Sequence, residues 1–286
     1  MKDWIKELET IDFSSGVYSQ SYQDELLSII FDNIGTTNPT PFCVEFGFDS
    51  NSLEAGKGAN VARLVIENNW DALLLDGDHE NLEINLHRHF VSSSNIVEIF
   101  RRYNVPEEPE YISIDVDSTD LWIFDSLLGE YKAMVYSVEY NSHFPLDAAI
   151  TFPNDANERW EGDRGYGASL KALNMVAEKH GYSLLWVIPA LDAIFVRNDL
   201  IEDGSDQLCF PFKRWKDCTK LVRHLPLKNK ERAKIFIDYE FYSNNGQDSE
   251  LSKLSAYPVC KNYLVRKRVF QRIISKIKRL FWRRAY

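Results

Sequence analysis

PFCVEFGFDSN, residues 41–51, has the pattern of a buried β-strand that runs into a tight turn. The strand, Phe42–Phe46, is apolar except for Glu45 near its end, and Gly47 follows it directly. In an open α/β sheet, ligands bind beyond the carboxyl ends of the strands, where a glycine lets the backbone approach a ligand closely. Glu45 would then face a cationic or hydroxyl-bearing group. An ordinary buried strand and turn has the same pattern, so this stretch alone leaves both interpretations open.

The segments on both sides of this stretch alternate between apolar runs and runs with helical spacing. Further strands are expected at residues 71–76, 111–117, 133–139, 182–188 and 193–196, with a weak strand near 89–91. Helices are expected at residues 20–34, 60–69, 82–89, 96–103, 119–128 and 166–180. Strands and helices that alternate at these lengths predict an α/β fold with a mainly parallel, seven-stranded sheet that ends in an antiparallel hairpin.

Composition divides the chain into four regions. Residues 1–40 are a helical lead-in, and residues 41–200 are the sheet domain, which contains a polar insertion at 141–165. Residues 201–260 are rich in aromatic and charged side chains without a clear period, which we interpret as an appended lobe. Residues 261–286 are a basic tail, so the sheet domain is followed by a helical and irregular extension.

The overall composition excludes several classes of protein. Hydrophobic residues make up 44% of the chain and charged residues 27%, which is typical of a globular protein rather than a disordered one. The four cysteines are widely spaced, which favours free thiols in a reducing compartment over a zinc site. The first ten residues lack an apolar signal core, and no run of about 18 apolar residues occurs. We therefore expect a cytoplasmic protein that does not span a membrane.

The net charge of −10 is unevenly distributed. Residues 261–286 carry ten Lys or Arg and no acid, which leaves 23 bases against 43 acids in the rest of the chain. Such an acidic body repels nucleic acid, so no nucleic-acid partner is expected. Six apolar residues of the tail have the spacing of one helix face: Phe270, Ile273, Ile274, Ile277, Leu280 and Phe281. A basic amphipathic helix suits an anionic membrane surface, and docking on the acidic body or on a partner protein are the alternatives.

Acidic residues stand at the ends of four expected strands: Glu45, Asp76 with Asp78, Asp115 with Asp117, and Glu139. The carboxyl ends of parallel strands lie on one edge of a sheet, so these acids should gather there. Such a cluster costs stability unless a ligand or a cation compensates its charge. The acid that ends the second strand is well placed to accept both hydroxyls of a ribose. The pattern therefore predicts a functional site on this edge.

The order of these segments resembles the class I S-adenosylmethionine-dependent methyltransferases, and among them the FkbM-type family. The resemblance rests on the following residues: Ser19-Gln20 with Gln23-Asp24, Val44–Gly47, Ser113–Asp117, Val138–Asn141, Tyr166–Leu173 and Ala193–Arg197. It covers residues 19–200 and not the last third of the chain. Two features depart from the family pattern, because the first loop keeps only Gly47 and Ser118 stands where relatives often have glycine.

The resemblance implies a Rossmann-like fold, S-adenosylmethionine as cofactor and a set of cofactor-binding residues. These residues are Glu45, Gly47, Asn51, Asp76, Asp78, Ser94, Asn95 and Asp115. Glu45 and Gly47 would approach the methionine part, and Asp76 would hold the ribose. Residues 92–95 would lie near the adenine. The acids of the last two parallel strands would face the reacting methyl group.

Methyl transfer to a sugar hydroxyl needs in-line approach and help with removal of the hydroxyl proton. Asp117, Glu139 and the nearby His143 are the candidate catalytic residues, although a histidine in a loop is more often simply exposed. A Mg²⁺ ion is a candidate cofactor, and its candidate ligands are Asp115, Asp117, Glu139 and Asn141. The alternative is that these residues hydrogen-bond substrate and loop amides without a metal.

The function expected from the resemblance and the tail is O-methylation of a sugar hydroxyl, on a glycan or a lipid-linked polysaccharide at the cytoplasmic face of a membrane. Trp160, in the polar insertion, could stack on a sugar or pack within a lid. Two further hypotheses stay open. One is O-methylation of a small metabolite, and the other is a non-catalytic scaffold that keeps the fold and docks through its tail.

Overall fold

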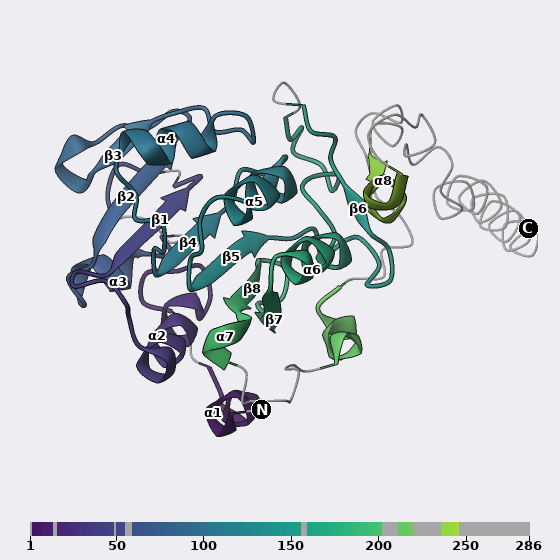
Figure 1. Ribbon diagram of the computed structural model, residues 1–286, viewed down its shortest axis with the longest axis horizontal. Coiled ribbons are helices and arrows are strands. Elements are labelled where there is room, and N and C mark those ends of the chain that lie inside the picture. The colour runs from purple at the N-terminus through teal and green to yellow at the C-terminus, as the bar shows by residue number, and fades with distance from the viewer. Residues whose placement is uncertain are drawn as a thin grey trace, which may run out of the picture.

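A seven-stranded, mostly parallel sheet forms the centre of the protein in the computed structural model (Figure 1). The structure describes residues 2–13, 16–48, 50–54, 59–155, 159–201, 211–219 and 236–245. In chain order the strands of the sheet are β1 Phe42–Phe46, β2 Asp71–Asp76, β3 Leu86–Arg88, β4 Tyr111–Ile114, β5 Val135–Glu139, β7 Tyr182–Val187 and β8 Asp192–Arg197. Their spatial order is β3-β2-β1-β4-β5-β8-β7, and the hairpin strands β7 and β8 supply the antiparallel pairs. The fold is therefore α/β with a mainly parallel sheet and an antiparallel hairpin, as the sequence predicts, and it is compatible with the Rossmann-like fold that the resemblance implies.

The helices cover the sheet on both faces. They are α1 Asp3–Glu7, α2 Gln23–Ile34, α3 Ala62–Ile66, α4 Ile96–Arg102, α5 Asp120–Leu128, α6 Leu170–Lys179, α7 Asn198–Ile201 and α8 Tyr239–Asn245. From β1 to β2 the chain moves along the sheet in one direction, and from β4 to β5 it moves in the other. Because both connections are right-handed, α3 and α5 lie on opposite faces. Contacts agree with this, since α4, α5 and α6 pack in a row and α2 packs on α3.

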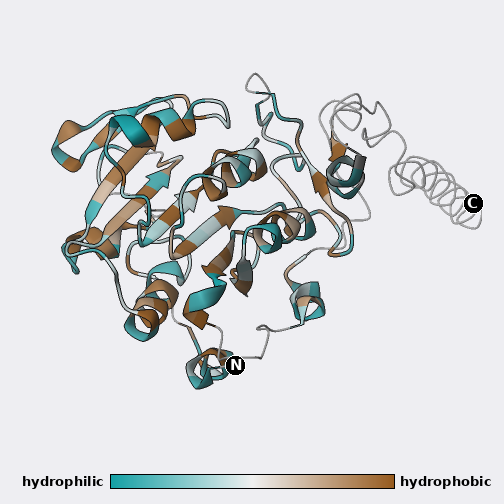
Figure 2. Cartoon of the chain, in the orientation of Figure 1, coloured by the Kyte–Doolittle hydropathy of each residue, from teal (hydrophilic) through white to brown (hydrophobic). Residues whose placement is uncertain are grey.

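The central strands are mostly hydrophobic because helices cover both of their faces (Figure 2). All four residues of β4 are buried, and so are the four residues Cys43–Phe46 of β1. Aromatic side chains fill the space between the sheet and α5, where Phe124 packs on both Tyr136 and Phe195. This continuous apolar pattern is why the sequence located these strands correctly.

The prediction of a helix at residues 82–89 is wrong. The segment forms a single 3-10 turn, Leu82–Ile84, followed by the edge strand β3, Leu86–Arg88. Asn85 adopts a left-handed backbone conformation with φ of 55° between them, which ends the turn and redirects the chain along β2. The third strand therefore lies a few residues before the expected position near 89–91. A three-residue strand at a sheet edge has too few residues to show a period.

Two other expected helices are shorter than their apolar patterns. The helix expected at 60–69 spans only Ala62–Ile66, because the chain turns at Asn69 with φ of 56°. The helix expected at 166–180 begins at Leu170, where the preceding Ser169 caps it by accepting a hydrogen bond from the backbone N–H of Ala172. Gly181, at φ of 79°, follows its end as predicted.

A second, two-stranded sheet joins the polar insertion to the region after residue 201. Its strands are β6, Ile150–Thr151, and β9, Ile237–Asp238, and they pair antiparallel. Phe236 packs on Phe144 and Phe152 beneath this sheet. Sequence analysis missed both strands because each has only two residues. The contact ties part of the region interpreted as a lobe to the main domain.

The tail at residues 261–286 and most of residues 201–260 lie outside the described residues, so the amphipathic helix stays a prediction. Among the helices that the structure describes, none is both long and apolar enough to cross a membrane.

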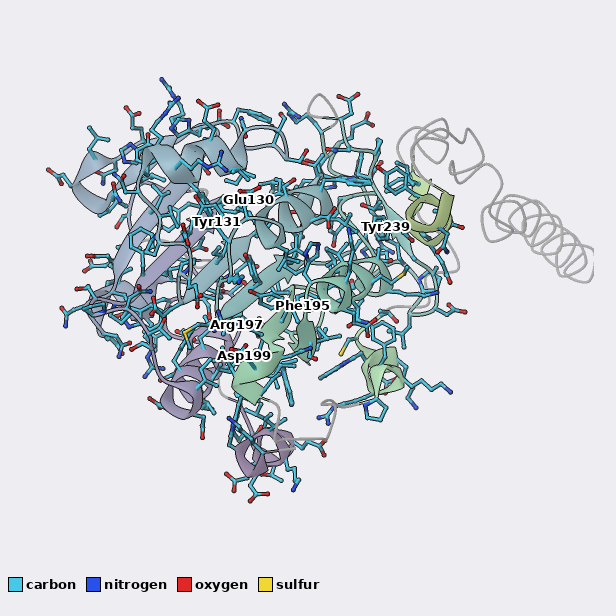
Figure 3. The ribbon with its side chains drawn as sticks, in the orientation of Figure 1. Glu130, Tyr131, Phe195, Arg197, Asp199 and Tyr239 are labelled. Carbon is cyan, nitrogen blue, oxygen red and sulfur yellow. The ribbon has the colours of Figure 1, made fainter. Side chains whose placement is uncertain are left out.

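The amino edge of the sheet is held by ion pairs (Figure 3). At the end of β8, Arg197 lies 2.7 Å from a carboxylate oxygen of Asp199 and 2.9 Å from one of Glu108. The guanidinium also donates to the backbone carbonyl of Lys132. These contacts satisfy Arg197 within the fold and tie the end of β8 to the segments before β4 and β5.

Candidate active site

The main cavity lies at the carboxyl ends of the parallel strands and has a volume of about 510 Å³. It spans the point between β1 and β4 where the strand order reverses, which is where open α/β sheets bind their ligands. It reaches from Asp76 at the end of β2 to Glu139 at the end of β5 and Asp192 at the start of β8. Its volume falls within the range of small-molecule sites.

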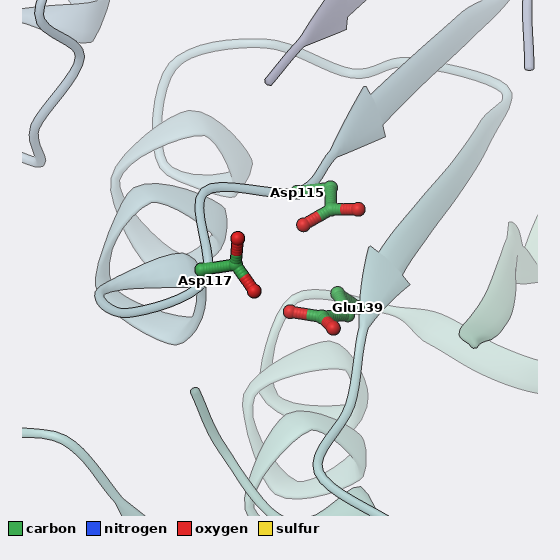
Figure 4. Close-up of side chains that lie close together, drawn as sticks. All are labelled: Asp115, Asp117 and Glu139. Atoms are coloured by element: carbon green, nitrogen blue, oxygen red, sulfur yellow. The ribbon is translucent and has the colours of Figure 1, made fainter. Parts of the chain in front are cut away.

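Three carboxylates converge in the middle of this cavity (Figure 4). Asp115 and Asp117 come from the loop after β4, and Glu139 is the last residue of β5. One oxygen of each carboxylate lies within 4.8 Å of those of the other two. Glu139 Oε2 is buried and accepts no hydrogen bond from any residue that the structure describes. The sequence predicted all three as neighbours, and the structure brings them together.

Backbone contacts set the positions of these acids. Gly47, with φ of 75°, lies so close to the loop after β4 that a Cβ there would come within 1.7 Å of the carbonyl oxygen of Asp115. Asp120, the first residue of α5, accepts hydrogen bonds from the backbone N–H groups of Val116 and Ser118 at 2.7 and 3.0 Å. The loop that carries Asp115 and Asp117 is therefore positioned by close packing against Gly47 and by hydrogen bonds to Asp120.

The electrostatic environment of this cluster favours a positive ligand. Burial, together with the neighbouring carboxylates, raises the pKa of Asp115 and the pKa of Glu139 well above their usual values. Burial raises the pKa of Asp120 to about 7 even though two loop amides donate to it. Six acids line the cavity, namely Asp76, Asp78, Asp115, Asp117, Glu139 and Asp192, and the described basic side chains on its wall are His89 and Arg159. A bound cation would offset this excess of negative charge.

Glu45 lies beneath the cavity rather than on its wall. Its side chain is only 4% exposed, and its two oxygens accept from the backbone N–H groups of Asn60 and Val61 at 2.9 and 3.1 Å. Burial raises its pKa to about 7 despite these bonds. The carboxylate predicted to approach a cofactor directly thus anchors the start of α3, and it acts on the cavity through Asn60, which lines it.

Asp76 and Asp78 both line the cavity at the end of β2. Asp76 Oδ1 accepts from the backbone N–H groups of Asp78 and His79 at 2.7 and 2.8 Å, and it lies 2.9 Å from Nδ1 of His79. Asp76 is buried and Asp78 is exposed. The turn therefore presents one buried, hydrogen-bonded carboxylate and one exposed carboxylate to the same space.

The segment predicted to lie near the adenine, residues 92–95, is not among the described residues that line the cavity. Ser94 and Asn95 lie at the start of α4, where Asn95 binds the backbone of Phe90 and Ser92 and Ser94 binds the hydroxyl of Ser92. The three residues that precede this segment, His89–Val91, line the cavity instead. Phe90 is 53% exposed, and the guanidinium of Arg159 lies 3.9 Å from its ring centroid.

Three other predicted residues are not among the described residues that line the cavity. Asn51 is exposed, and its carbonyl accepts from Asn81. Asn141 is fully buried, and its amide donates to the carbonyls of Arg164 and Tyr166 and accepts from the backbone of His143. The ring of His143 packs edge-on against Tyr166. Asn141 therefore fastens the insertion to β5, and its side-chain oxygen already has a donor.

Sequence analysis missed an acid and two amides at one end of the cavity. Asp192 is 4% exposed, and its Oδ2 accepts from the side-chain amides of Gln23 and Asn60. The predicted hairpin could have revealed Asp192. The first residue of an antiparallel strand lies at the carboxyl edge of the parallel strands beside it. Gln23 belongs to one of the motifs on which the family resemblance rests. That motif does not indicate that Gln23 binds Asp192.

Comparison with protein-family models finds no match for this chain. Comparison with curated proteins finds none either. The chemistry of the cavity is therefore the basis for a functional proposal.

Proposed function

We propose that the protein is an S-adenosylmethionine-dependent O-methyltransferase. The observation that carries the proposal is one cavity that joins a ribose-type carboxylate, Asp76 on β2, to the acid cluster of Asp115, Asp117 and Glu139 on β4 and β5. A nucleoside with a positively charged sulfonium matches both parts. The ribose diol suits Asp76, and the positive charge suits the cluster. The strand layout is also the one that the resemblance implies.

The charge of the cavity argues against the other common ligands of this fold. Dinucleotides and nucleoside triphosphates carry phosphates, which are bound by glycine-rich loops and helix N-termini. The first loop, GFDSNS at residues 47–52, contains a single glycine, and six acids line the cavity. Phosphates would be repelled there, whereas a sulfonium and an ammonium would be attracted.

Each part of the cofactor has a matching surface in this proposal. Asp76 accepts the ribose hydroxyls, and its bonds to the turn hold it in place. The adenine lies against His89–Val91, where the exposed ring of Phe90 offers a stacking face. Gly47 allows close approach because it has no Cβ. The cofactor supplies an activated methyl group on a cationic sulfur.

The acid cluster fits a divalent cation. Three carboxylates from two strand ends, one of them with a buried oxygen that no described residue donates to, form an all-oxygen set of the kind that Mg²⁺ prefers. Asp115, Asp117 and Glu139 would hold the ion, and Asn141 would not, because its side chain is engaged with the insertion. When bound, Mg²⁺ would lower the pKa of a coordinated hydroxyl.

If no metal ion binds at the cluster, Glu139 is the best candidate for the proton acceptor. The acceptor hydroxyl must lose its proton as the methyl group is transferred, and a carboxylate with a raised pKa is a better base than an ordinary one. Asp117 lies beside it at the cavity wall and can orient the hydroxyl by accepting a hydrogen bond. His143 contacts Tyr166 and not the described wall of the cavity, so it has no direct role in this proposal.

We propose a sugar hydroxyl as the acceptor. Arg159 lines the cavity, and the adjacent Trp160 is 46% exposed with its ring 6.1 Å from that of Tyr166. An exposed indole beside a polar pocket suits the apolar face of a sugar ring. If the sugar belongs to a lipid-linked polysaccharide, the basic tail would hold the enzyme at the cytoplasmic membrane face. If it belongs to a small metabolite, removal of the tail should leave activity unchanged.

The decisive experiment is calorimetric titration of the full-length protein with S-adenosylmethionine and S-adenosylhomocysteine, in Mg²⁺ and in EDTA, with NAD and ATP as anionic controls. We expect micromolar binding of the two sulfur nucleosides and none of the controls. Failure of well-folded protein to bind either nucleoside would overturn the methyltransferase proposal and favour a scaffold. Binding would justify a methylation screen that starts with glycans.

A further inference from the structure

Gln23 has a buried acceptor atom with no donor among the residues that the structure describes. It is the first residue of α2, it lines the main cavity and it is 3% exposed. Its Nε2 donates to Asp192 Oδ2, and its Oε1 is the atom without a donor. Exchange of the two amide atoms would set an oxygen against the carboxylate, so the orientation is determined by Asp192. A buried carbonyl without a donor is costly, which indicates that a ligand supplies one.

A chain of hydrogen bonds holds this corner of the cavity in place. Asn60 Nδ2 donates to Asp192 Oδ2 at 3.2 Å and to Ser113 Oγ at 3.0 Å. Ser113 in turn contacts Ser137 on β5 at 3.1 Å. Asp192 is therefore linked through Asn60 to the side chains of two central strands, β4 and β5.

We infer that Gln23 and Asp192 bind a primary ammonium group, the one at the amino acid end of the cofactor. This inference rests on the proposed function and adds to it a subsite that selects the intact amino acid end. An amide oxygen and a carboxylate are both acceptors, so they match a group with three N–H donors and a positive charge. A carboxylate or a phosphate in the same place would meet only acceptors and negative charge.

The charge on Asp192 supports this assignment. Asp192 is 4% exposed, and the donors that the structure describes for its Oδ2 are the neutral amides of Gln23 and Asn60. A buried carboxylate without a cation is unfavourable, and an ammonium would restore the balance. The position also fits, because Asp192 pairs with Glu139 across β5 and β8. The ammonium subsite is thus adjacent to the acid cluster at which the methyl group would react.

The test compares four nucleosides by calorimetry on the full-length protein. They are S-adenosylhomocysteine, its analogue without the amino group, its analogue without the carboxyl group, and 5′-methylthioadenosine. Wild-type protein should bind the analogue without the amino group at least tenfold more weakly than S-adenosylhomocysteine. Gln23→Leu and, separately, Asp192→Asn should weaken both ammonium-containing ligands at least tenfold and leave the other two unchanged. The second substitution keeps the test valid if the first does not fold.

Asn33→Ala is the matched control, because Asn33 lies at the other end of α2 and donates only to the carbonyl of Ile29. It should change no affinity. Equal weakening of all four ligands by both variants, or equal wild-type affinity with and without the amino group, would overturn the ammonium subsite alone. If none of the four binds to folded wild-type protein, the proposed function falls and the subsite falls with it.

Discussion

Glu139 and Asp192 lie directly opposite each other as a register pair of the antiparallel strands β5 and β8. The pairing sets the first residue of β8 beside the last residue of β5, at the edge where the cavity opens. Two acids that are far apart in the chain thereby become neighbours, and Asp192 adds to the effect of burial in raising the pKa of Asp115 and the pKa of Glu139. The cavity is therefore strongly acidic at both its centre and its hairpin end.

Gly47→Ala should destabilise the protein by about 2–4 kcal/mol, because a left-handed backbone conformation and a clash with the carbonyl of Asp115 both disfavour a side chain there. Gly35→Ala is the matched control, since Gly35 has φ of 74° but open space around it. Its cost should be only the conformational part, about 1–2 kcal/mol. Urea unfolding measures both values, and equal losses would show that the Asp115 loop accommodates the added methyl group.

Asp76→Ala should weaken binding of S-adenosylhomocysteine at least tenfold, about 1.4 kcal/mol, because the ribose hydroxyls lose a charged acceptor. The substitution also releases the turn at residues 78–79, so thermal unfolding must accompany the titration. His79→Gln is the control that removes the ring contact and keeps the carboxylate. Unchanged affinity in folded Asp76→Ala would refute the ribose assignment.

Asp117→Asn should abolish stabilisation by Mg²⁺. In wild-type protein, MgCl₂ should raise the midpoint of thermal unfolding, because an ion that binds only the native state stabilises it. Asp78→Asn is the control, since Asp78 is an acid of the same cavity that lies outside the cluster of three. The metal hypothesis fails if both variants respond to Mg²⁺ as the wild type does.

Glu139→Gln should abolish methyl transfer and leave the affinity for S-adenosylhomocysteine within a few-fold of wild type. The amide keeps the size of the side chain but cannot accept the proton of the acceptor hydroxyl. The same change removes a buried group whose charged form is disfavoured, so the ligand-free variant should be more stable than wild type at pH 8. Retained turnover would eliminate Glu139 as the base.

The ligand-free protein should lose stability as the pH rises from about 4.5 to 8. The pKa values of Glu45, Asp120 and Asp192 are raised to about 7, 7 and 6, so the native state keeps protons that the unfolded chain has already released. Stability falls with pH wherever the native state binds more protons, by about 1.4 kcal/mol per pH unit for each proton. Urea unfolding at pH 5.5 and 8 tests the sign.

Glu110 should make the folding stability increase with pH, which is opposite to the effect of the three acids above, and it should do so in a lower pH range. Burial raises its pKa, but several donors, including the backbone N–H groups of Asn38 and Phe42, outweigh burial and lower it overall. Its stabilising effect is therefore present above the unfolded pKa of about 4.3 and is lost as the pH falls below that value. A stability that rises steadily between pH 5.5 and 8 would contradict the raised pKa values of Glu45, Asp120 and Asp192.

The sequence by itself determined the order of the strands and helices along the chain and the acids that end three parallel strands. Strands buried on both faces are continuous apolar runs, so β1, β2, β4 and β5 were recognisable, and the residues after them had to lie at one edge. Asp76, Asp115 and Glu139 were found in this way. The two-residue strands β6 and β9 were missed, and β3 was expected a few residues too late, because two or three residues carry no period.

Only the tertiary structure decided which polar groups share the cavity. Glu45 and Asp76 have similar positions in the sequence pattern, yet one carboxylate is bound by the start of α3 and the other lines the cavity. Gln23 and Asp192 come from opposite ends of the domain and meet through strand pairing and helix packing. The direction of a side chain and its hydrogen-bond partners depend on contacts between distant segments, and local residue patterns do not contain that information.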